Sequence, residues 1–167
     1  FSSKALAQYA DGLDKLFDKH GEARFIISTQ ISEEDMSDIK TGYEVRSDGE
    51  SLTEDDKKCL GNLAFMIGNG SVSIKFGLSS TGIFHSKWGL FEDKINDGDV
   101  VYFMGSNNET EQALERNYED FDVDVSWDTS PNVRQRIAKK ENVFDDLWND
   151  RDEHVRVVDA NQVVSNI

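Results

Sequence analysis

The sequence lacks several features that would place it in a well-defined class. Its 167 residues include a single cysteine, Cys59, so no internal disulfide can form and a reducing, cytoplasmic location is expected. No run of about 18 apolar residues occurs, so no membrane-spanning helix and no membrane partner are predicted. Basic residues are scarce, because 18 Lys and Arg face 33 Asp and Glu, for a net charge of −15. Such a surface repels nucleic acid unless a local basic strip or a partner domain intervenes.

Common nucleotide-binding and hydrolase motifs are missing as well. The chain contains no Gly-x-x-x-x-Gly-Lys-Ser/Thr, no Gly-x-Gly-x-x-Gly and no Gly-x-Ser-x-Gly. One cysteine and three scattered histidines do not form a zinc pattern. The acidic run near 119–128 could bind Mg²⁺, but such a run is more typical of a solvated strand face. The sequence therefore predicts no cofactor and no metal site.

Aromatic residues argue for a folded domain despite this polarity. Ten Phe, four Tyr and three Trp accompany a hydrophobic content of 37%. The length suits one domain with a real core, so residues 1–167 are predicted to be a single domain. Phe1 is not a natural start, and we expect a fragment of a longer chain.

Apolar spacing and capping pairs predict mixed helices and strands. Ser32 with Asp35 and Thr53 with Asp56 are expected to begin helices, and Cys59 is expected to be buried in the second of these. The polar stretch 44–52 is interpreted as a loop. Helices are expected over 4–19, 32–41, 53–68, 110–116 and 131–148, and strands over 24–28, 72–76, 83–91, 100–104, 119–127 and 155–158. This pattern predicts an α/β domain with one central mixed sheet flanked by helices.

One pair of side chains suggests a reaction. His85 and Lys87 are two residues apart on the predicted strand 83–91, so they should share a face. A nucleophile beside a cation is what attack on a phosphodiester needs. The ordinary alternative is an edge strand with a polar patch near its start.

Two further pieces of sequence fit the same chemistry. The predicted strand 100–104 ends in Gly105-Ser106-Asn107-Asn108, and a hairpin with strand 83–91 would bring Ser106 and Asn108 near His85. The alternative is a simple turn or helix cap. In strand 119–127, alternation predicts that Phe121 and Val123 lie on the inner, apolar face and that Asp122 and Asp124 lie on the wet face. Glu119 begins the apolar face and could hold the imidazole N–H. It could equally lie in solvent at the frayed strand end.

Together these residues resemble a known family. The phospholipase D-like superfamily carries His-x-Lys, four residues, Asp, and then Gly-Ser-x-Asn downstream. In the small bacterial nucleases of the superfamily, a Glu follows the motif's Asn by about the spacing that separates Glu119 from Asn108. Residues 60–150 are more closely similar to the phospholipase D-like domains fused to bacterial helicases and restriction-type enzymes. One residue departs from the pattern, because Glu92 stands at the Asp position, with Asp93 next to it. The matching residues are His85, Lys87, Gly105, Ser106 and Asn108.

The resemblance implies a metal-independent phosphodiesterase, and in particular a nuclease. His85 would form a covalent phosphohistidine, and His85 of the partner subunit would act as acid and base. Lys87, Ser106 and Asn108 would hold the phosphate oxygens, and Glu119 would orient the ring. One motif per chain implies a homodimer, or a second motif outside this sequence.

The expected substrate is nucleic acid, with DNA favoured by the helicase and restriction-enzyme resemblance. Trp88 and Tyr118 could stack on bases, although core packing is the ordinary role. The basic cluster Arg134, Arg136, Lys139 and Lys140 could touch phosphates or simply face solvent. The alternative function is a catalytically weak docking or dimerisation module of a larger helicase or restriction-type protein. The acidic surface and the substituted Asp position favour that alternative.

Overall fold

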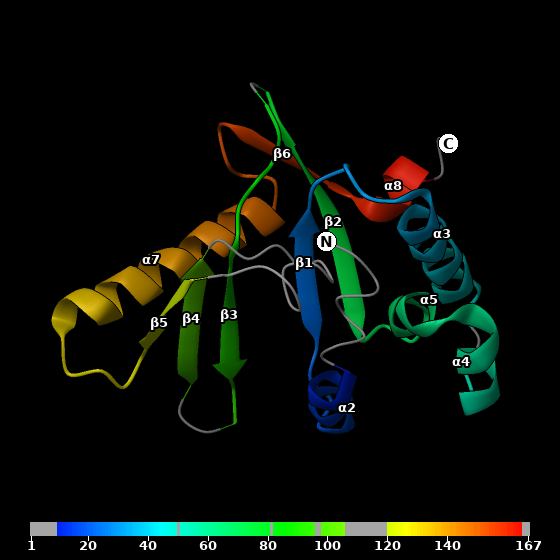
Figure 1. Cartoon of the computed structure of the whole chain (residues 1–167), viewed down its shortest axis with the longest axis horizontal. Helices are drawn as coiled ribbons and strands as arrows, with labels where there is room; N and C mark the ends of the chain where they lie inside the picture. The colour runs from blue at the N-terminus through cyan, green and yellow to red at the C-terminus, as the bar shows by residue number, and fades with distance from the viewer. Residues whose placement is uncertain (1–9, 50, 81, 96–97, 106–119, 165–167) are drawn as a thin grey trace.

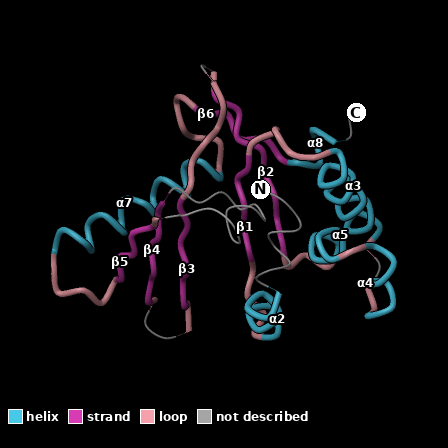
Figure 2. Tube along the Cα trace, in the orientation of Figure 1, coloured by secondary structure: helices cyan, strands magenta, loops and turns pink. Residues whose placement is uncertain are grey.

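A computed structural model of the chain describes residues 10–49, 51–80, 82–95, 98–105 and 120–164. These residues form a mixed α/β structure with two three-stranded sheets (Figures 1 and 2). The prediction of mixed helices and strands is confirmed, whereas the prediction of one central sheet is wrong for the described residues. In chain order the elements are α2 Ala10–Asp18, β1 Ala23–Ile27, α3 Glu33–Asp48, α4 Glu54–Leu60, α5 Asn62–Gly68, β2 Val72–Ser79, β3 Trp88–Asp93, β4 Asp99–Gly105, β5 Phe121–Val125, α7 Pro131–Trp148, β6 Val155–Asp159 and α8 Ala160–Val164.

The first sheet has the strand order β1-β2-β6. Strand β1 pairs with β2 in parallel, from Ala23 opposite Val72 to Ile27 opposite Phe76. Strand β6 pairs with the other edge of β2 in antiparallel register. The sheet is therefore mixed, with β2 at its centre.

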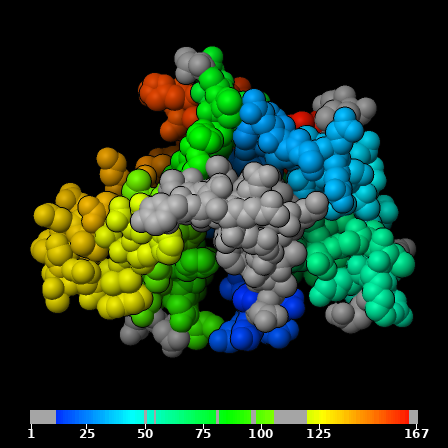
Figure 3. Space-filling view, viewed as in Figure 1, coloured from blue at the N-terminus to red at the C-terminus, as the bar shows by residue number. Residues whose placement is uncertain are grey.

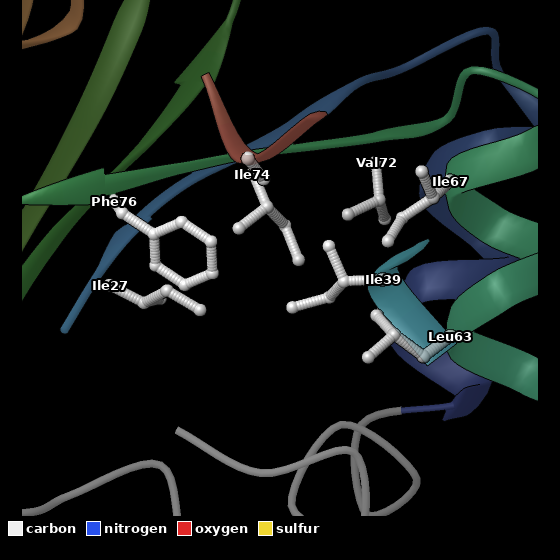
Figure 4. Close-up of a cluster of buried hydrophobic side chains, with 8 residues drawn as sticks. Ile27, Ile39, Leu63, Ile67, Val72, Ile74 and Phe76 are labelled. Atoms are coloured by element: carbon white, nitrogen blue, oxygen red, sulfur yellow. The ribbon is translucent and has the colours of Figure 1, made fainter. Parts of the chain in front are cut away.

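The main core lies between this sheet and the helices α3, α5 and α8. Alternate residues of β2, namely Val72, Ile74 and Phe76, point to one side and are fully buried. They meet Ile39 of α3 and two residues of α5, as Figure 4 shows. This packing explains why β2 reads as a clear alternating strand in the sequence. The labelled side chains of the cluster are Ile27, Ile39, Leu63, Ile67, Val72, Ile74 and Phe76.

The second sheet has the order β3-β4-β5 and is antiparallel throughout. A small core joins it to α7, made of Val100, Tyr102 and Ile137 with Trp88 and Leu90 packed around them. In the space-filling view, this sheet with α7 and the helices α3–α5 lie on opposite sides of the molecule (Figure 3). The predicted hairpin between strands 83–91 and 100–104 is confirmed, although its first strand is shorter than expected.

Helix α7 connects the two sheets. Its first half covers the second sheet, while its last turns carry Phe144 and Trp148 to the first. The Arg24 guanidinium of β1 lies 5.0 Å from the centre of the Phe144 ring and 5.5 Å from that of Trp148. Lys75 of β2 donates to the Trp148 carbonyl at 3.0 Å. One long helix thus ties both sheets together.

The predicted capping pairs are both confirmed. The Ser32 hydroxyl accepts a hydrogen bond from the Asp35 backbone N–H at 3.0 Å. Thr53 and Asp56 form a complete capping box, in which each side chain satisfies a backbone N–H at the start of α4. Because the side chains stabilise otherwise unpaired N–H groups, these short patterns identify helix starts reliably.

Two helix boundaries differ from the prediction. Helix α3 continues to Asp48 instead of ending near Thr41, so part of the expected loop 44–52 is helical. Gly49, with φ of 70°, ends it in the left-handed conformation. The expected single helix 53–68 is two helices, because Gly61 adopts φ 81° and ψ 160°, a conformation open mainly to glycine.

Cys59 is exposed on α4, so the prediction of a buried thiol is wrong. The expected helix 110–116 and the first residues of the expected helix 4–19 lie outside the described residues. No helix in the described part of the chain is long and apolar enough to cross a membrane.

Candidate active site

His85 and Lys87 lie in the segment 82–87 that connects the first sheet to the second. This segment has no regular secondary structure, and β3 begins only at Trp88. The predicted strand 83–91 is therefore wrong over its first five residues, and the two side chains do not share a strand face. Instead, the segment that carries them contacts β2 of the first sheet at Gly77 and β4 of the second sheet at Gly105.

Both ends of the connecting segment are anchored. The Phe84 ring packs directly on Gly77 of β2, where an added Cβ atom would lie 2.7 Å from Cγ of Phe84. At the other end, the Gly105 backbone N–H donates to the Lys87 carbonyl at 3.2 Å. Because His85 lies between these two attachments, its backbone is held on both sides.

The two side chains of the pair touch each other. Lys87 Nζ lies 2.7 Å from Nε2 and 3.1 Å from Nδ1 of His85. His85 is exposed and Lys87 is half-buried, so solvent or a substrate can reach the ring. In a neutral imidazole only one ring nitrogen accepts a hydrogen bond, and the ammonium group can donate to that nitrogen. The arrangement offers a nucleophile and a cation within one hydrogen-bond length.

The end of β4 lies beside this pair. Strand pairing places Trp88 opposite Met104, and Gly105 follows next to Lys87. A hollow of about 250 Å³ opens here, lined by Met104, Gly105, Asp120, Phe121 and Asp122. The predicted site residues Ser106, Asn108 and Glu119 lie outside the described residues, as does Tyr118. The described part of the predicted set is thus His85, Lys87 and Gly105.

Glu92, at the position of the family's Asp, belongs to the opposite face of the sheet from Gly89 and Phe91. Its carboxylate lies 3.9 Å from Lys94 and close to Glu141 of α7. Burial, followed by the charges of Glu92 and Asp145, raises the pKa of the Glu141 carboxyl. Glu92 therefore faces α7, where two carboxylates repel each other.

The two faces of β5 are reversed relative to the prediction. Phe121 and Val123, expected on the inner side, are 64% and 51% exposed. Asp124, expected on the wet side, turns toward α7 and accepts two hydrogen bonds from the Arg136 guanidinium. That contact lowers the pKa of the Asp124 carboxyl. A charged partner on the helix has drawn the polar face inward, which strand alternation alone cannot predict.

Two of the four basic residues of α7 already have partners within the chain. Arg136 binds Asp124, and Lys140 lies over the ring of Trp88 at 4.8 Å. Trp88 itself packs against Tyr102 and Phe144, with ring centres 6.1 and 6.3 Å away. The expectation that Trp88 packs in the interior is confirmed. Arg134 and Lys139 remain exposed on the helix surface.

Sequence reasoning missed Phe84 and Gly77, which hold the site segment against the first sheet. The signal was present, because Gly77 follows the alternating run 72–76, and in the structure it is a buried residue inside β2. A glycine inside a strand commonly marks the close approach of another group.

Comparisons of the chain with protein-family models, with curated proteins and with solved structures found no match. Among the described residues, no group of three or more His, Cys, Asp or Glu side chains could hold a metal ion. The resemblance to the phospholipase D-like superfamily therefore depends on the motif residues themselves.

Proposed function

We propose that this chain is a metal-independent phosphodiesterase, and specifically a nuclease, that works through a phosphohistidine in a site shared by two copies. The observation that carries the proposal is the contact of Lys87 Nζ with His85 Nε2 at 2.7 Å, in an exposed and anchored segment. Imidazole is a nucleophile at neutral pH, and an adjacent ammonium group can stabilise the charge of a phosphoryl group in transfer.

The reaction has two balanced steps. A ring nitrogen of His85 attacks phosphorus, the N–P bond forms, and the P–O bond to the leaving alcohol breaks as His85 of the partner subunit gives that oxygen a proton. Water then attacks the phosphohistidine, the same partner imidazole takes the water proton, and the N–P bond breaks. Lys87 holds a non-bridging oxygen in both steps.

Lys87 also has to move during this cycle. In the free protein its ammonium group contacts the ring nitrogens that would attack phosphorus. A phosphate group offers the ammonium stronger acceptors, so substrate binding would release the lone pair of the ring. Ser106 and Asn108 are proposed to supply further donors, and Glu119 to orient His85.

The proposed substrate is nucleic acid, with DNA favoured. Exposed Arg134 and Lys139 on α7 are available for phosphate contacts. The net charge of −15 opposes tight binding by this chain alone. An attached DNA-binding or helicase domain would supply the missing affinity.

Hydrolysis of bis(p-nitrophenyl) phosphate in excess EDTA tests the chemistry. We expect turnover that EDTA leaves intact and that His85→Ala abolishes. Lys87→Ala should lower kcat by about a hundredfold, as loss of one charge-stabilising donor does elsewhere. His154→Ala, which removes another exposed histidine, is the matched control and should be unaffected. Turnover that stops in EDTA, or that persists in His85→Ala, would refute the proposal.

A second candidate function is a docking or dimerisation module without strong catalysis. Two observations favour it: the second sheet exposes apolar side chains, and Glu92 stands where the phospholipase D-like motif has Asp. In that case all variants, and the unmodified chain, would show the same background hydrolysis while association persists.

A further inference from the structure

The second sheet has one apolar face that is not packed on α7. Six residues, here called the open face, share this side of the three strands by alternation: Phe91, Val101, Phe103, Phe121, Val123 and Val125. Three of them are strongly exposed, with Phe91 at 66%, Phe121 at 64% and Val123 at 51%. The other three are half-buried. Large apolar side chains that gather in this way mark an interaction site.

The strand register arranges the open face in rows that lead to the candidate site. Phe91, Val101 and Val125 form one row, and Phe103 and Val123 form the next, beside Gly89. Phe121 lies opposite Gly105, whose N–H is bonded to Lys87. The open face therefore begins next to the His85–Lys87 pair and runs away from it along the strands.

The charge of the molecule limits what can cover this face. The whole chain carries −15, yet none of the six residues is charged. Asp93 and Asp99, the two acidic residues on the same side of the sheet, pair with each other at the end of β3 and β4 that lies away from Gly105. Two copies of an acidic chain repel each other over most of their surfaces, so a neutral face is where they approach at the lowest cost. A nucleic acid brings further negative charge and gains no basic partner on the open face itself.

The size of the face also fits a dimer contact. The three strongly exposed side chains present about 350 Å² of apolar area, on the usual areas of such residues. A stable interface covers about 800 Å² on each partner, with an apolar centre and a polar rim. The open face supplies such a centre, and Phe91, stacked on Phe103 with ring centres 5.2 Å apart, supplies a rigid aromatic anchor.

We propose that a second copy of this chain docks on the open face, sheet against sheet, with the two-fold axis parallel to the strands. Packed sheets lie about 10 Å apart. With this axis, both His85–Lys87 pairs lie at the same end of the interface and face each other across one gap. The role of the gap as a two-copy active site rests on the proposed function, whereas the interface rests on the open face alone.

Sedimentation of the full chain, with and without substitutions, tests the interface. Wild type should be a dimer whose dissociation constant rises at least about tenfold in Phe91→Lys and in Phe121→Lys. Ile95→Lys is the matched control, because Ile95 is 80% exposed but lies in the turn after β3, and it should stay dimeric. Circular dichroism checks folding, and Phe91→Ser and Phe121→Ser replace any lysine variant that unfolds.

Each outcome either supports or overturns the proposed interface. A monomeric wild type, or open-face variants that remain as dimeric as the control, would overturn it. If the wild type is monomeric and the open-face variants instead lose binding to a single-stranded oligonucleotide, the face stacks bases and no second copy docks there. Hydrolysis is scored separately. A dimer without turnover refutes the proposed function but keeps the interface. A monomer with turnover overturns both the interface and the shared site, and leaves only the phosphodiesterase activity.

Discussion

The two sheets differ in how completely they are covered. In the first sheet, Phe76 is fully buried under α3 and α5, and the opposite side meets Phe84 and the end of α7. In the second sheet, Phe91 occupies a similar mid-strand position and is 66% exposed. The comparison indicates that the first sheet supplies most of the stability, while the second keeps an apolar surface for binding.

The largest expected effect is the difference in free energy of unfolding between alanine substitutions at Phe76, in the first sheet, and at Phe91, in the second. Phe76→Ala should lower the free energy of unfolding by about 3–5 kcal/mol, because it leaves a cavity in a packed core. Phe91→Ala should lower it by less than about 1 kcal/mol. Urea unfolding at low protein concentration, where association contributes little, measures both. Equal losses would show that the second sheet is covered as well as the first.

A smaller effect is expected where α7 meets the second sheet. Because Arg136 lowers the pKa of Asp124 from its ordinary 3.8, their contact stabilises the fold above that pH. The contribution is lost as the pH falls through the lower, native pKa. Arg136→Gln should lower the free energy of unfolding slightly at pH 7, because exposed ion pairs contribute little, and should have almost no effect near pH 2. Urea unfolding at several pH values measures this, with exposed Arg134→Gln as the control. A cost independent of pH would exclude the ion pair as its cause.

The smallest change is expected at Tyr102, in the core of the second sheet. Its hydroxyl is buried and has no hydrogen-bond partner among the described residues. Burial, followed by the charge of Asp124, raises the pKa of this phenol. Tyr102→Phe removes an unpaired polar atom, so stability should be unchanged or rise by up to about 1 kcal/mol. A thermal or urea midpoint that falls markedly would reveal a partner for the hydroxyl.

Local signals in the sequence predicted local structure well. The capping pairs at Ser32 and Thr53 gave correct helix starts, and Pro131 marked the first residue of α7. The alternating pattern after Val72 gave β2, and the apolar run 155–158 gave β6. These signals depend on neighbours within a few residues, which the sequence contains directly.

The errors came from contacts between distant residues. The division into two sheets depends on which strands pair, and the reversal of β5 depends on Arg136, twelve residues beyond Asp124. The predicted helix 32–41 stops one residue before Gly42, but α3 continues through it, and the missing side chain lets α5 approach closely at Ile67. For the candidate site, the sequence predicted that His85 and Lys87 lie together but not that a loop, anchored by Phe84, brings them there.

The chain order of the two sheets has a consequence for synthesis of the protein. Strands β1 and β2 precede the whole second sheet and α7, whereas their partner β6 follows them. On the ribosome, one edge of β2 must therefore wait without its neighbour until the inserted sheet has emerged. The first sheet, although it contains the larger core, is the one that can be completed only late in translation.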